Sequence, residues 1–132
     1  MSPQGKTPQV KIRPAIFPAD KDTVRQLFLA YAQSLPVKLD FQGFEEELAR
    51  LPGKYAAENR GCVYLAYTQD QSVETVTGSV ALRSFPTTTS IPTCELKRLY
   101  VAPSSRGVGA SKLLMGAVHD GCATSLREMR LR

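Results

Sequence analysis

Cysteine is scarce in this chain of 132 residues, and its placement argues against two classes of small protein. The three cysteines, Cys62, Cys94 and Cys122, are an odd number at wide spacings, and no two of them form a C-x-x-C pair. Disulfide frameworks and structural zinc sites are built from even sets or closely spaced pairs. We therefore expect reduced thiols, no metal site and a cytoplasmic location.

Long apolar runs are missing as well. No stretch approaches the roughly 18 consecutive apolar residues that a membrane-spanning helix requires, so we expect no membrane association. Residues 1–10 are polar and lack the apolar segment of a secretory signal. We expect a loose tail over residues 1–9 and, because no internal repeat or second boundary is visible, one domain over residues 10–132.

The remaining composition is that of a globular protein with excess positive charge. Apolar residues make up 42% of the chain and charged residues 22%, which is ordinary usage. The 17 Lys and Arg residues against 12 Asp and Glu residues give a formal net charge of +5. This charge suits an anionic partner, whether nucleic acid, a membrane surface or a phosphorylated cofactor, but a solvated basic surface explains it equally well.

Two segments in the first half have the apolar spacing of α-helices. The first helix has a candidate N-cap at Asp20 and ends before Pro36. Its apolar positions, at i, i+3, i+4, i+7 and i+11, are Val24, Leu27, Phe28, Tyr31 and Leu35. The second, shorter helix has an apolar face made of Phe44, Leu48 and Leu51. Residues 45–47, all glutamate, should lie on its solvated face, where they could also attract a cationic amine.

The second half alternates with the period of β-strands. The expected strands lie near Val10 and Ile12 and at residues 62–68, 75–82, 94–101 and 128–132. In the strand at 75–82 we expect Val76 and Val80 on one face. In the strand at 94–101 we expect Leu96 and Arg98 on one face and Leu99 on the other. A helix before the last strand has an apolar face made of Ala110, Leu113, Leu114, Ala117 and Val118.

This order of elements predicts an α+β fold with a mixed, mostly antiparallel sheet and flanking helices. The helix between the last two strands makes a β-α-β crossover, so those strands should be parallel neighbours. The earlier strands are joined by short turns and should be antiparallel.

A glycine-bearing turn between the fourth strand and this helix is the most informative motif. It lies within the run V-A-P-S-S-R-G-V-G-A-S-K-L-L, which starts at Val101. Unpaired N–H groups and the helix dipole at such a helix start suit a phosphate or pyrophosphate. The run is neither a Walker A loop nor a G-x-G-x-x-G dinucleotide turn. A plain helix-capping turn would have the same features.

The run E-L-K-R-L-Y-V-A-P-S-S-R-G-V-G-A-S-K-L-L resembles the acyl-CoA-binding motif of the GNAT superfamily of N-acetyltransferases, [QR]-x-x-G-x-[GA]. Arg106 and Gly109 match, and Ser111 replaces the final small residue. The segments L-D-F-Q-G-F-E-E-E-L-A-R-L-P-G-K-Y, G-S-V-A-L-R and E-M-R-L extend the resemblance over most of the chain.

The resemblance implies a site for acetyl-CoA, without a metal. The pantetheine arm should pair with the backbone of the fourth strand at Leu99, Tyr100 and Val101, and a splay between the fourth and fifth strands should admit the thioester. The pyrophosphate should lie on the turn and helix start, formed by Arg106, Gly107, Val108, Gly109, Ala110, Ser111 and Lys112.

The resemblance also implies that a primary amine attacks the thioester directly, without a covalent acyl-enzyme. An ammonium group, with a pKa of about 10.4 in free lysine, must lose its proton before it can attack. Glu95 resembles the glutamate that several family members use as the base. A surface or salt-bridged glutamate would look the same in the sequence, and both interpretations stand.

Family domains continue past the fifth strand with a further helix and strands, which usually supply a tyrosine as general acid. The chain ends at Arg132, so we expect a GNAT fold that lacks these elements. It could be a fragment, a homodimer that covers the strand edge, or a catalytically impaired CoA-binding module. We expect N-acetyltransferase activity and, because no exposed aromatic residues are interleaved with the basic ones, no nucleic-acid partner.

Overall fold

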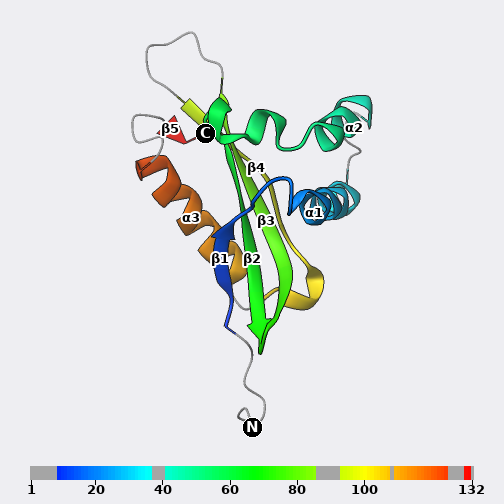
Figure 1. Ribbon diagram of the computed structural model, residues 1–132, viewed down its shortest axis with the longest axis vertical. Coiled ribbons are helices and arrows are strands. Elements are labelled where there is room, and N and C mark those ends of the chain that lie inside the picture. Colours follow the sequence, from blue (N-terminus) through cyan, green and yellow to red (C-terminus); the bar gives the residue numbers. More distant parts are fainter. Residues whose placement is uncertain (1–8, 37–40, 86–92, 108, 125–129, 132) are drawn as a thin grey trace.

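The computed structural model describes residues 9–36, 41–85, 93–107, 109–124 and 130–131, and its centre is a five-stranded sheet (Figure 1). In chain order the strands and helices are β1 (Lys11–Pro14), α1 (Lys21–Ser34), α2 (Phe41–Ala49), β2 (Cys62–Asp70), β3 (Val73–Phe85), β4 (Thr93–Val101), α3 (Ala110–Thr124) and β5 (Arg130–Leu131). Short 3₁₀ helices, η1 (Gly53–Tyr55), η2 (Ala57–Asn59) and η3 (Pro103–Ser105), lie in the connections. The predicted order of elements is confirmed. Residues 1–8 of the expected tail and residues 128, 129 and 132 of the last expected strand lie outside the described residues.

The strands follow one another across the sheet in the order β1-β2-β3-β4-β5. Neighbours are antiparallel from β1 to β4, whereas β5 runs parallel to β4, with Thr93 opposite Arg130 and Cys94 opposite Leu131. The predicted α+β fold and its parallel last pair are therefore confirmed.

The two faces of the sheet carry separate apolar clusters. The α3 cluster lies on one face and includes Val80, Leu82, Val101, Ala110, Leu114 and Val118. The α1–α2 cluster lies on the other and includes Val24, Phe28, Phe44, Leu48, Leu51, Tyr55 and Ala81. Figure 1 shows α3 on one side of the sheet and the first two helices on the other. The predicted apolar stripes are confirmed except at Leu113, which is 44% exposed.

A bulge in β3 changes which face its residues occupy. Ala66 of β2 pairs with Gly78, but the next residue, Tyr67, pairs with Val76, so β3 has one extra residue at this point. Val76 consequently packs with the α1–α2 cluster and Val80 with the α3 cluster. The prediction that these two valines share a face was wrong, because an extra residue in a strand reverses its alternation.

A second bulge interrupts β4. Tyr100 pairs with Ser79, and Lys97 pairs with Ala81, so two residues of β4 lie opposite one of β3. One of these two is Arg98, whose φ is 60°. Leu96 and Leu99 both pack on the α3 cluster although they are three residues apart. The prediction that they lie on opposite faces was wrong for the same reason.

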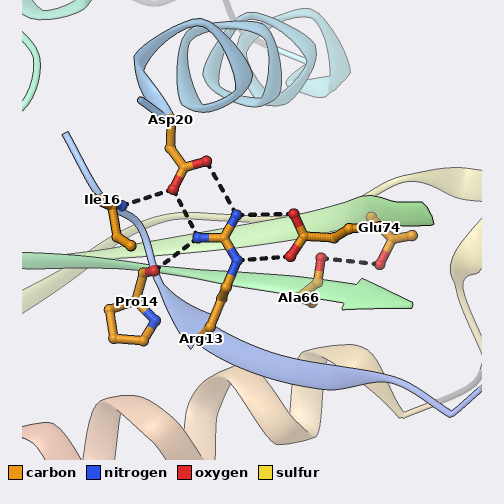
Figure 2. Close-up of polar contacts among 7 residues, drawn as sticks. Arg13, Pro14, Ile16, Asp20, Ala66 and Glu74 are labelled. Carbon is orange, nitrogen blue, oxygen red and sulfur yellow. Dashed lines mark hydrogen bonds and ion pairs between the residues drawn. The ribbon is translucent and has the colours of Figure 1, made fainter. Parts of the chain in front are cut away.

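Arg13 of β1 links the sheet to the start of α1 (Figure 2). Its guanidinium donates to both Asp20 carboxylate oxygens, at 2.7 and 3.1 Å, and to both oxygens of Glu74 on β3, at 2.8 and 3.1 Å. Asp20 is the N-cap residue of α1, as predicted, but its side chain makes no capping bond. It accepts instead from the backbone N–H of Ile16 at 2.8 Å, and the hydrogen bonds from Arg13 hold the pKa of this carboxyl below its ordinary value.

Gly61 and Gly116 make a matched pair for a test of this packing. A Cβ on Gly61 would lie 2.6 Å from Tyr55 Cα and 2.8 Å from the Leu82 carbonyl oxygen, whereas a Cβ on Gly116 of α3 meets no atom within 4 Å. We expect Gly61→Ala to lower the free energy of unfolding by about 1–3 kcal/mol, and Gly116→Ala to raise it by about 0.5–1 kcal/mol. Urea unfolding followed by circular dichroism measures both. A Gly61→Ala protein as stable as the wild type would contradict the packing described here.

Candidate functional site

The glycine turn leads from β4 through η3 into α3. Gly107 and Gly109 have φ values of 89° and 84°, in the left-handed region that other residues avoid. The helix starts at Ala110, and its first backbone hydrogen bond runs from the Leu113 N–H to the Gly109 carbonyl oxygen at 3.1 Å. Val108, predicted to be part of the site, lies outside the described residues.

The space in front of the α3 N-terminus is open. A Cβ built on either Gly107 or Gly109 meets no atom within 4 Å. The first N–H groups of an α-helix have no acceptor within the helix, and here they belong to Ala110, Ser111 and Lys112. Ser111 and Lys112 are exposed. The turn therefore has the donors, the charge and the room that a pyrophosphate requires.

Arg106, the first residue of the sequence motif, turns back toward β4. Its Nε donates to the Val101 carbonyl oxygen at 2.8 Å, and its guanidinium lies over the Tyr100 ring, 5.7 Å from the centroid. Arg106 thus connects the turn to the end of the strand, a role that the sequence analysis did not anticipate. The residues predicted for the pantetheine arm lie directly before it: Val101 is buried, and Leu99 and Tyr100 are half-buried.

One edge of β4 is open over most of its length within the described part of the chain. The two residues of β5 pair with Thr93 and Cys94 only, and β3 occupies the other edge. The outer edge from Glu95 to Val101 therefore faces no described strand. Six residue steps of extended chain span roughly 20 Å, so this edge extends about that far from Glu95 to Val101, and η3 then leads to the glycine turn.

Glu95, the predicted base, lies opposite Arg83 of β3. The Arg83 Nη1 and Glu95 Oε1 atoms are 3.9 Å apart, and both side chains are 23% exposed. The salt-bridged glutamate that the sequence left open is thus present, as a long ion pair. The Glu95 side chain is partly exposed, so that a ligand can reach its carboxylate.

An ion pair that the sequence analysis missed joins α2 to the β4 bulge. Arg98 donates from Nε and Nη2 to the two Glu47 carboxylate oxygens at 2.9 and 2.8 Å, and the side chains are only 9% and 7% exposed. The Arg98 guanidinium also lies over the rings of Tyr31 and Phe44, 5.6 and 5.2 Å from their centroids. Glu47 was expected on a solvated face, and that expectation was wrong. Its position three residues after Phe44, next to the apolar stripe, was the signal that could have revealed it.

Glu47 accepts from two further groups. The Lys54 Nζ atom lies 3.1 Å from one carboxylate oxygen, and the Tyr55 hydroxyl donates to the other at 3.1 Å. Burial raises the pKa of the Glu47 carboxyl, but Arg98 and Lys54 outweigh it and hold the pKa below its ordinary value. Burial and the neighbouring Glu47 charge raise the pKa of Tyr55. A surface cavity of about 320 Å³ beside this group is lined by Gly43, Glu46, Glu47, Arg50, Pro52, Gly53 and Lys54.

Within the described residues, no group of three or more His, Cys, Asp and Glu side chains is arranged to hold a metal ion. None of the described helices is both long and apolar enough to cross a membrane.

No model of a protein family matches the chain. An uncharacterized N-acetyltransferase of Dictyostelium discoideum is 45% identical over 62 residues, which cover 47% of this chain and 27% of the relative. An uncharacterized N-acetyltransferase of Schizosaccharomyces pombe is 33% identical over 110 residues, which cover 83% of this chain and 63% of the relative. The chain therefore spans less than two thirds of the length of either relative.

Solved structures share the fold. An acetyltransferase of the GNAT family from Staphylococcus aureus Mu50 superposes with a TM-score of 0.65 at 18% identity, over 86% of this chain and 66% of that chain. A predicted acetyltransferase from Clostridium acetobutylicum, solved with acetyl-CoA, gives a TM-score of 0.61 at 16% identity, over 94% of this chain and 80% of that chain. At these identities the likeness establishes the fold alone.

The Glu47–Arg98 pair generates a prediction about stability and its pH dependence. Glu47→Gln leaves Arg98 buried without its counter-charge, so the free energy of unfolding at pH 7 should fall by about 3–5 kcal/mol. Because the folded-state pKa of Glu47 is lowered, the wild type keeps this stability above the ordinary carboxyl pKa of about 4.3 and loses it as the pH falls further. The difference between the two proteins should therefore shrink in acid.

Urea unfolding between pH 7 and pH 3 measures this difference. The control is Glu46→Gln, because Glu46 is the exposed neighbour on the same helix and should change stability by less than about 0.5 kcal/mol. Equal effects of the two substitutions would show that the ion pair contributes nothing to stability.

Proposed function

This chain belongs to the GNAT superfamily of N-acetyltransferases, and on that premise we propose that it transfers an acetyl group from acetyl-CoA to a primary amine. The observation that carries the proposal is the open α3 N-terminus next to a strand edge that no described strand pairs with beyond Cys94. Gly107 and Gly109 expose the first-turn amides of α3, and the outer edge of β4 leads from them toward Glu95.

The chemistry of the cofactor matches these two surfaces in order. Its pyrophosphate is an anion, and the α3 amides and the Lys112 side chain supply donors and positive charge. Its pantetheine arm carries amide groups, which can pair with a free strand edge as an added strand would. Leu99, Tyr100 and Val101 offer that edge, and Arg106 holds its end in place through the Val101 carbonyl.

Glu95 is the residue to which we assign proton removal from the acceptor amine. It lies on the face of the sheet that carries α2, with its carboxylate accessible and Arg83 close enough to orient it. Direct attack of the neutral amine on the thioester forms the amide bond and releases the CoA thiolate, which takes up a proton. A positioned base contributes typically about 10²–10⁴-fold to such a step.

A catalytically impaired CoA-binding module is the second candidate. One observation favours it: Glu95, the assigned base, is ion-paired with Arg83. The module and the enzyme share the cofactor site and differ in turnover, so binding and turnover are measured separately.

Calorimetric titration of the 132-residue chain with acetyl-CoA tests the cofactor site. We expect saturable binding that falls at least about tenfold in Gly109→Trp, because the indole fills the space in front of the α3 amides. Tenfold corresponds to about 1.4 kcal/mol, less than the net value of two hydrogen bonds to a charged group. Gly116→Trp is the control, since Gly116 is equally open but lies within α3, away from its N-terminus. Equal acetyl-CoA affinities of the two variants would show that the turn is not part of the cofactor site.

Turnover by Glu95→Gln tests the base. With an amine that the wild type acetylates, we expect kcat to fall by about 10²–10⁴-fold while acetyl-CoA binding stays unchanged. Glu45→Gln, on the exposed face of α2, is the control and should keep full activity. Unchanged turnover in Glu95→Gln excludes Glu95 from proton transfer, and absence of turnover in the wild type despite binding favours the second candidate.

A further inference from the structure

Lys97 lies on the α2 side of the sheet, in the middle of β4. It pairs across the strands with Ala81, which is fully buried in the α1–α2 cluster, and directly paired residues in a sheet point to the same face. Glu95 lies two residues earlier on the same face. Lys97 is half-buried, and the charges of Lys54, Arg98, Glu95 and Glu47 act on its ammonium group.

The neighbours of Lys97 are paired, whereas its own ammonium group makes no hydrogen bond or ion pair with any residue that the structure describes. Arg98 and Lys54 both contact Glu47, at 2.8 and 3.1 Å, and Arg83 approaches Glu95 at 3.9 Å. Among the described residues, the charged groups that act on Lys97 are the cations Lys54 and Arg98 and the anions Glu95 and Glu47, and Glu95 is already ion-paired with Arg83. Together with Arg83 and Lys97 itself, these cations thus outnumber the anions. Lys54, Arg83 and Arg98 each have a carboxylate partner, whereas the Lys97 charge is not balanced by a described carboxylate.

A half-buried ammonium group among other positive charges favours the binding of an anion. Burial lowers the pKa of Lys97, and the positive charges of Lys54 and Arg98 lower it further, while Glu95 and Glu47 act in the opposite direction. A partly desolvated cation without a partner is unfavourable, and a bound anion removes both the repulsion and the lost hydrogen bonds. The same excess charge disfavours a second ammonium group on a ligand at this place.

We propose that Lys97 binds an anionic group of the acceptor, so that the acceptor is a small amine that also carries a carboxylate or a phosphate group. This inference rests on the proposed function, because it places the acceptor on the face that carries Glu95. The reacting amine then lies toward Glu95 and the anion toward Lys97, two residues further along the strand. Polyamines and strongly basic peptides are poor acceptors by the same electrostatics.

Matched pairs of amines test the proposal on the wild-type chain with acetyl-CoA. One pair is an amino acid and its amide, and the other is ethanolamine phosphate and ethanolamine. We expect kcat/KM for the anionic member to exceed that of the neutral member by about tenfold or more, which is the effect of one hydrogen bond to a charged group. The pair with the larger ratio distinguishes a carboxylate from a phosphate.

Two variants of Lys97 and one control locate the effect. Lys97→Met, similar in length but uncharged, should lose the preference mainly through a higher KM for the anionic amine, and Lys97→Arg should keep most of it. Lys11→Met removes an exposed cation from β1 and should change nothing. Acetyl-CoA binding should be equal in all four proteins, which also shows that the variants fold.

Binding of the same amines to the chain with CoA, measured by calorimetry, separates this inference from the proposed function. Anion-dependent binding that Lys97→Met abolishes, without any turnover, supports the inference and overturns the activity. Turnover of neutral and anionic amines at equal rates overturns the inference and supports the activity. An anion preference that persists in Lys97→Met overturns the assignment to Lys97.

Discussion

The ion pair between Arg98 and Glu47 holds β4 in the shape on which the rest of the site depends. Arg98 has a φ of 60°, a conformation that costs a residue with a side chain about 1–2 kcal/mol. Its guanidinium is almost completely buried against Tyr31 and Phe44 and donates two hydrogen bonds to a carboxylate that is equally buried. Removal of that carboxylate from a buried cation costs more than the backbone strain. The pair therefore stabilises the bulge and attaches α2 to the sheet.

Because of the bulge, β4 contributes apolar side chains to the α3 cluster on one face of the sheet and the Arg98 ion pair to the other face. It turns Leu96 and Leu99 toward the α3 cluster, while Arg98 reaches α2. Under the proposed function the cofactor lies along the outer edge of β4 and on the N-terminus of α3, and the acceptor approaches from the face that carries Glu95 and Lys97. The two substrates then reach the same strand from different directions, which is what direct transfer between them requires.

Most of the fold could be predicted from the sequence, because local periodicity reports local structure. The stripes Val24–Phe28 and Phe44–Leu48 are buried as their spacing indicated, and the β-α-β crossover makes β4 and β5 parallel. The failures share a cause. The faces predicted for Val76 and Leu99 were wrong because a bulge depends on pairing with the neighbouring strand. It cannot be recognised from the alternation of apolar and polar residues. Asp20 was correctly placed as an N-cap, but its carboxylate binds Arg13, a partner that only the folded chain brings near.

The candidate site also has a part that the sequence predicts and a part that only the fold decides. The sequence by itself determined the glycine turn, because only residues without a Cβ adopt positive φ at Gly107 and Gly109 without strain, and it determined that a helix begins directly after them. Only the tertiary structure decided the charges on the α2 face. Glu47 and Arg98 are 51 residues apart in the chain, and Lys54 and Lys97 are nearly as distant from each other. Whether such charged groups find an ion-pair partner depends on burial and on distances of a few ångströms, which no local sequence pattern encodes.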